Sequence, residues 1–180
     1  MNKTVPIMSK DDERFMAFCG LVQWTRGVIH QSKRIVDTTN MFHDLVHNCD
    51  LDHVALMDTL RCEHLYFVVA VNKLLEHRRW VQDLGLCKEI DFAEIDSFPG
   101  RDIKDLRNMR EHIVEYFQGN GRNKSRWHVE TPEYKADASS CVGTKIGGRL
   151  DYAKFTEAAT RLLGVLIHLP VPYPPRDIDS

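Results

Sequence analysis

The chain has 180 residues, of which 43% are hydrophobic and 28% are charged, and its formal net charge at pH 7 is −2. This length fits one domain with a real hydrophobic core, and the near balance of charges excludes a global basic field that would attract nucleic acid. Any contact with RNA or DNA must therefore be local.

The cysteines and the apolar runs indicate the cellular compartment of the protein. The five cysteines are scattered and form no CxxC pair, which favours reduced thiols over a disulfide scaffold. The first residues contain no apolar signal core, and the longest apolar run, "LYFVVAV" (65–71), is too short to cross a bilayer. The sequence therefore predicts a soluble, cytoplasmic protein with no membrane partner.

The first half of the chain predicts two long helices. Ser9 and Asp12 form a Ser-x-x-acid start signal, and apolar residues then recur at helical spacing into the upper 30s or 40s. "DTTN" (37–40) is a possible break in this helix. After a turn cluster at 47–52, a second helical pattern runs from about residue 52 to 80. Because that pattern contains no glycine or proline, "LYFVVAV" is expected to be central helix rather than strand.

The second half predicts shorter elements. "SFPG" (97–100) is a breaker, a third helix is expected over 101–118, and "QGNG" (118–121) supplies a glycine just past its end. A small hairpin or meander is expected over about 127–147. Its strands are predicted near 127–130, 138–142 and 144–147.

The end of the chain predicts one more helix and a tail. Asp151 is expected to cap a helix over about 152–168, and the proline-rich stretch 169–180 is expected to be extended. The fold class is therefore mainly α, an up-and-down bundle of about four helices with the β-hairpin inserted before the last helix. We expect a single domain over 1–180 with a helical core at about 10–168. No GxGxxG or P-loop motif occurs, so a dinucleotide or P-loop nucleotide site is unsupported.

The stretch "DLRNMREH" (105–112) concentrates reactive side chains on the third predicted helix. A helical projection gives this helix two faces. The apolar face carries Leu106, Met109, Ile113 and Phe117, and the polar face carries Arg107, Asn108, Glu111 and His112.

This polar face has two interpretations. It is either a solvated face with an Arg107–Glu111 ion pair at i,i+4, or a site that cleaves phosphodiesters. In the second case His112 acts as general acid or base, Arg107 lies against the developing negative charge, and Asn108 bonds the imidazole to fix its tautomer.

"RNMREH" resembles the R-x4–6-H motif of HEPN domains, all-helical proteins often encoded in prokaryotic defence and toxin–antitoxin systems. Arg107, Asn108 and His112 fill the motif positions. The resemblance implies metal-independent RNA cleavage without a cofactor by a homodimer. Two copies of the motif would face each other, and a ribose 2′-OH would attack the adjacent phosphate. A cognate antitoxin is then a possible partner.

A basic cluster follows the motif helix. Arg122, Lys124 and Arg126 lie within "GNGRNKSR" (119–126) and would suit contacts to an RNA backbone. The next residue, Trp127, is expected to pack in the core rather than stack on a base, because Trp is usually highly buried.

Two other functions remain open. His43 and His47 are i,i+4 and would present two imidazoles to a metal, with a third ligand from His53, His64 or His112. Alternatively, the chain is a non-catalytic helical-bundle protein that binds a protein partner.

Overall fold

The structure is a computed structural model that describes residues 9–47 and 53–172. Most of the predicted turn at 47–52 and the predicted tail beyond residue 172 lie outside these residues. Within the described part, the protein is mainly helical, with six α-helices and small antiparallel sheets that precede the last helix. No described helix is long and apolar enough to span a membrane.

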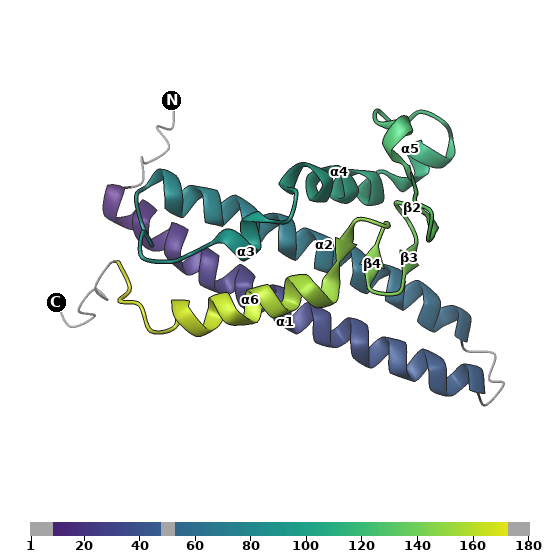
Figure 1. Cartoon of the computed structure of the whole chain (residues 1–180), viewed down its shortest axis with the longest axis horizontal. Helices are drawn as coiled ribbons and strands as arrows, with labels where there is room; N and C mark the ends of the chain where they lie inside the picture. Colours follow the sequence, from purple (N-terminus) through teal and green to yellow (C-terminus); the bar gives the residue numbers. More distant parts are fainter. Residues whose placement is uncertain (1–8, 48–52, 173–180) are drawn as a thin grey trace, which may run out of the picture.

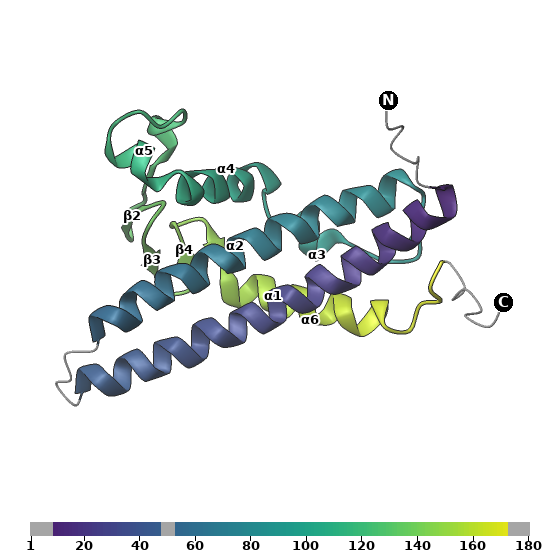
Figure 2. The same cartoon turned by 180° about the vertical axis from the view of Figure 1, so that it is seen from behind.

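Two long helices form the frame of the molecule. Helix α1 (Lys10–His47) and helix α2 (His53–Asp83) run antiparallel and side by side along most of their length (Figures 1 and 2). The Ser9 hydroxyl accepts the Asp12 N–H at 3.1 Å, which confirms the predicted start of α1. The fully buried large side chains between the helices include Leu21, Val28, Ile35, Phe67 and Leu74.

The possible break at "DTTN" does not occur, because α1 continues through it to His47. Ile35 and Thr38 are buried, so the helix is still held by packing at this point. The Thr39 hydroxyl donates to the Ile35 carbonyl at 2.7 Å, a bond within the helix rather than a competing turn. Tertiary packing therefore overrides the weak local signal.

Four shorter helices complete the helical part of the fold. They are α3 (Ala93–Asp96), α4 (Gly100–Glu111), α5 (Ile113–Phe117) and α6 (Tyr152–Leu166). Helix α4 lies against α2, and α6 lies against α1 and α3 (Figure 1). The Asp151 carboxylate accepts the Lys154 N–H at 3.2 Å, which confirms the predicted cap of α6.

The predicted single helix over 101–118 is wrong in one respect: it is divided at His112 into α4 and α5. Leu106 and Met109 are fully buried, as the apolar face predicts. Phe117 was expected on the same face but is 70% exposed, because the chain changes direction before it.

Short strands connect α5 to α6 after a 3-10 turn at Lys124–Arg126. Strand β1 (His128–Glu130) pairs with β2 (Lys135–Asp137), and β3 (Cys141–Val142), β4 (Lys145–Ile146) and β5 (Leu150–Asp151) form a second antiparallel sheet. The predicted hairpin thus consists of two small sheets and extends to Asp151. The sequence did not separate β2 from β3, since each has only two or three residues.

The middle of α2 places two ionisable side chains, Glu63 and His64, in the protein interior. Arg34 and Gln31 of α1 both hydrogen-bond the Glu63 carboxylate. Burial and, to a smaller extent, the Arg110 guanidinium lower the pKa of His64 to about 4, although Glu63 acts in the opposite direction. The folded chain therefore keeps His64 neutral at neutral pH.

This burial makes stability depend on pH. Because the folded pKa of His64 lies below its ordinary value of 6.5, the unfolded chain binds a proton at this residue before the folded chain does. The contribution of neutral, buried His64 to the free energy of unfolding is complete above pH 6.5 and is lost as the pH falls toward 4. We expect the free energy of unfolding to drop by about 2 kcal/mol more between pH 7 and pH 5 in the wild type than in His64→Gln.

Urea unfolding of both proteins at the two pH values measures this difference. His30→Gln, at an exposed position of α1, is the matched control and should keep the wild-type pH dependence. An identical pH dependence in His64→Gln and the wild type would refute the prediction.

Candidate nucleic-acid site at the corner between α4 and α5

The site begins with the end of helix α4. His112 has φ −108° and ψ 31°, which is not helical, and its N–H still donates to the Asn108 carbonyl at 3.0 Å. Its own carbonyl accepts the Glu115 N–H at 3.0 Å and starts α5. His112 therefore stands at a corner between two helices, with its side chain exposed.

Aromatic packing explains the direction that the chain takes after this corner. The Tyr116 ring stacks on Trp127 with centroids 4.9 Å apart, and Phe117 meets the same indole edge-on at 5.7 Å. Trp127 is buried, as expected from the sequence. Because a continuous helix would direct these rings elsewhere, the contacts with Trp127 stabilise the bent arrangement.

The loop after α5 is held against the same tyrosine. Gly119 has φ +77°, which confirms the glycine predicted past the helix end. Gly121 lies directly on the Tyr116 ring, and the Asn123 N–H donates to the Tyr116 hydroxyl at 3.2 Å. These contacts bring Arg122, between them, to the corner.

A groove of about 260 Å³ lies where the corner and the loop meet. Its walls are polar and combine side chains from α4, α5 and the loop. The lining residues are Asn108, His112, Glu115, Tyr116, Arg122 and Asn123.

The Glu115 carboxylate orients the His112 imidazole. Its Nδ1 lies 3.0 Å from a Glu115 carboxylate oxygen, so an Nδ1–H tautomer donates to that carboxylate. In that tautomer Nε2 is the proton acceptor. A general base with an acidic partner at Nδ1 and a cationic Arg122 in the same groove suits chemistry at a phosphate.

Arg107 and Glu111, both expected in the site, point elsewhere. The Arg107 Nε lies 3.3 Å from the Glu111 carboxylate, which confirms the i,i+4 ion pair, and its Nη1 lies 4.0 Å from Glu76 of α2. Its Nη2 donates to the Asn108 side-chain oxygen at 2.9 Å. Arg107 thus holds Asn108, and this bond differs from the Asn108–His112 bond expected from the spacing.

The three residues of the basic cluster have different environments. Arg122 lines the groove, and Lys124 is exposed in the adjacent turn. The Arg126 guanidinium forms ion pairs with Asp102 and Asp105 of α4, so its charge is used within the protein. Arg126 fixes the loop to α4 rather than extending toward a ligand.

The alternative metal site gains no support. Among the residues that the structure describes, no group of three or more His, Cys, Asp or Glu side chains is arranged to hold a metal. The side chains of His47 and His53 lie outside the described set, so the predicted cluster around His43 is not tested as a whole. His64 is in the core, and His112 lies at the corner.

The sequence did not indicate three residues of the groove, Glu115, Tyr116 and Asn123. The signal for Tyr116 was its position four residues after His112, and the signal for the loop was Gly121, which leaves room for an aromatic ring. Both were obscured by the expectation of one straight helix.

Replacing Gly121 with alanine tests how the loop is held. The added Cβ would overlap the Tyr116 ring, so either the ring or the loop must move. We expect the free energy of unfolding to fall by about 1–3 kcal/mol, as in other overpacked sites. Gly164→Ala, in open space on α6, is the matched control and should be neutral or stabilising by up to about 1 kcal/mol. Thermal or urea unfolding measures both, and equal stability of the two variants would contradict the described contact.

Comparison with protein-family models, with curated proteins and with solved structures found no match for this chain.

Proposed function

We propose that this chain is a metal-independent endoribonuclease of the HEPN-like class, a cytoplasmic helical bundle acting in prokaryotic defence or as the toxin of a toxin–antitoxin pair. The observation that carries the proposal is the groove that His112 and Arg122 share. It combines a proton-transfer group with a cation, which phosphodiester cleavage requires. The resemblance of "RNMREH" to the family motif supplies the class.

The proposed reaction needs no metal. One His112 removes the proton from a ribose 2′-OH, and the oxygen attacks the adjacent phosphorus. The bond from phosphorus to the 5′-oxygen breaks, and a protonated His112 of a second copy donates a proton to that oxygen. The products are a 2′,3′-cyclic phosphate and a 5′-OH end. Homodimerisation is therefore part of the proposal.

The remaining residues assist these steps. Arg122 binds the phosphate oxygens as negative charge develops, and Asn108 hydrogen-bonds the RNA from the groove wall. Arg107 is assigned a positioning role, since it holds Asn108 and pairs with Glu111. Lys124 contacts the backbone outside the groove.

The direct test is cleavage of a labelled single-stranded RNA by the purified chain in the presence of EDTA. The proposal predicts products with cyclic phosphate ends and no cleavage of the same sequence made with 2′-deoxyribose. Cleavage that requires added metal ions, or cleavage of the DNA control, would contradict it.

A second candidate is a non-catalytic protein that binds a protein partner, including a possible antitoxin. The observation in its favour is that Val114 and Phe117 of α5 are exposed large hydrophobics beside the corner. A folded chain that cleaves no RNA but forms a stable complex through α5 would favour this candidate over the nuclease.

A further inference from the structure

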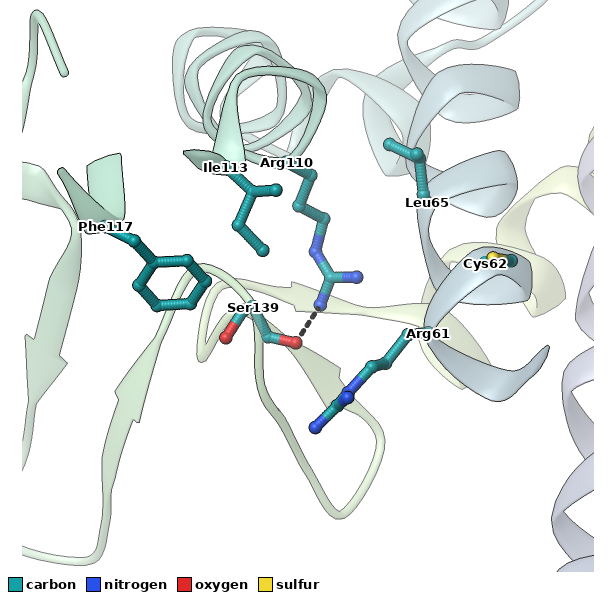
Figure 3. Close-up of a pocket in the computed structure, with 7 residues that line it drawn as sticks. All are labelled: Arg61, Cys62, Leu65, Arg110, Ile113, Phe117 and Ser139. Carbon is teal, nitrogen blue, oxygen red and sulfur yellow. Dashed lines mark hydrogen bonds between the residues drawn. The ribbon is translucent and has the colours of Figure 1, made fainter. Parts of the chain in front are cut away.

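A second cavity lies between α2 and the α4–α5 corner, and it shares no lining residue with the groove of His112. Its volume is about 280 Å³, which suits a small molecule. Figure 3 shows Arg110 extending into it from α4, with Leu65 of α2 on one side and Ile113 and Phe117 on the other. The cavity thus has an apolar wall around a cationic group.

Arg110 is unusual because its charge is buried. The residue is only 7% exposed, and no carboxylate of the described residues forms an ion pair with it. Its Nη2 donates to the carbonyls of Ser139 and Ser140, each at 3.0 Å. Its Nε is buried and has no hydrogen-bond partner within the described part of the chain.

The segment opposite Arg110 is fixed in place. One carboxylate oxygen of Asp137 accepts the N–H groups of Ser139 and Ser140 at 2.8 and 2.9 Å, as well as the Ser139 hydroxyl at 2.6 Å. This turn aims the two carbonyls at Arg110 and occupies the nearby acid. The guanidinium therefore receives partial compensation from the two carbonyls and a favourable electrostatic interaction with the Asp137 carboxylate, but it has no ion-pair partner among the described residues.

A buried guanidinium with no direct ion pair and an unbonded Nε is costly, so we expect an anion to complete the arrangement. Burial lowers the pKa of Arg110 to about 10, and the group still carries its charge at neutral pH. A guanidinium recognises carboxylate and phosphate through paired N–H donors.

A second cation stands beside the first. Arg61 of α2 also lines the cavity, and its guanidinium lies below Arg110 in Figure 3. Its side chain is 65% exposed and pairs with Asp58 at 3.1 Å. An anion that enters the cavity therefore meets an exposed positive charge as well as the buried one.

We infer that this cavity is a binding site for a small organic anion, an oxyanion joined to a compact apolar group. The oxyanion lies against Arg110 and Arg61, and the apolar group lies against Leu65, Ile113 and Phe117. This inference does not depend on the proposed ribonuclease activity, because binding to the cavity is measured without RNA.

Titration calorimetry of the full chain with benzoate, phenyl phosphate, benzamide and acetate tests the inference. Benzamide keeps the ring without the charge, and acetate keeps the charge without the ring. We expect benzoate or phenyl phosphate to bind at least about tenfold more tightly than both controls, which is the range of a charge-assisted hydrogen bond. The tighter of the two identifies the oxyanion as carboxylate or phosphate. Equal affinity for benzamide, or binding by none of the four, would overturn the inference.

Variants locate the site. Arg110→Gln should weaken binding of the tighter anion about tenfold or more, and Arg61→Gln about two- to fivefold. Arg101→Gln, at an exposed position of α4 outside the cavity, should leave the affinity unchanged.

Because loss of a buried arginine threatens folding, the Arg110 Nε–H resonance of the wild type is followed by NMR as a second readout. The assignment would be overturned if the Arg110 resonance did not move at saturating anion. It would also be overturned if Arg61→Gln and a folded Arg110→Gln both bound the anion with the wild-type affinity.

Discussion

Replacing His112 with alanine should reduce the rate of RNA cleavage by about 10²–10⁴-fold, the range expected for losing a general acid–base group. The side chain is exposed at the helix corner, and its hydrogen bond to Glu115 joins two exposed groups. The substitution should therefore change stability by less than about 1 kcal/mol. The cleavage rate in EDTA and the thermal unfolding temperature are measured on the same preparations.

The control is His168→Ala, at an exposed position after α6, which should cleave at the wild-type rate. Cleavage by His112→Ala at the wild-type rate would remove the imidazole from the mechanism. Equal losses in both histidine variants would indicate a contaminating nuclease or a folding effect rather than catalysis.

The second large effect is expected at the interface of α1 and α2. Arg34 donates to both carboxylate oxygens of Glu63, with Nη2–Oε1 at 2.5 Å and Nε–Oε2 at 2.9 Å. The Glu63 side chain is only 4% exposed, and the hydrogen bond from Arg34 is the largest of the effects that lower its pKa. Arg34→Leu leaves this buried carboxylate with Gln31 alone, so the free energy of unfolding at pH 7 should fall clearly below that of the wild type.

Arg61→Leu is a closely matched control. Arg61 is also 65% exposed and also pairs with an acid on the α1–α2 frame, but its partner Asp58 is 69% exposed. Because an exposed pair contributes little, Arg61→Leu should cost less than about 1 kcal/mol. In urea unfolding, the double variant Arg34→Leu/Glu63→Gln should recover part of the loss. Equal costs for the two arginine variants would show that burial of the acid does not decide the effect.

The sequence predicted helices well where one pattern ran without interruption. The caps at Ser9 and Asp151 and the buried positions Leu106 and Met109 follow from spacing alone. The break at His112 was not predictable in this way, because no glycine or proline marks it. It depends on Trp127, which is distant in sequence and packs on Tyr116.

Only part of the candidate site was predicted, because contacts between residues distant in sequence place the rest. His112, Asn108 and Arg122 lie in one groove, but Arg107 pairs with Glu111 and lies near Glu76, a residue of another helix. Arg110, one of the most unusual side chains, lies in the same motif and has the same residue type as Arg107. Arg110 is distinguished from Arg107 by its burial and by its contact with the turn at Ser139 and Ser140, which is distant in sequence.

The proposed function requires that RNA binds at the corner of His112. The most direct measurement is an NMR titration of the histidine ring resonances of the full chain with an uncleavable 2′-O-methyl RNA oligonucleotide. We expect the His112 resonances to shift and saturate and those of exposed His30 and His168 to stay in place, and we expect Arg122→Gln to weaken the response about tenfold. An oligonucleotide that binds while the His112 resonances stay in place, or one that does not bind at all, would contradict the proposed function.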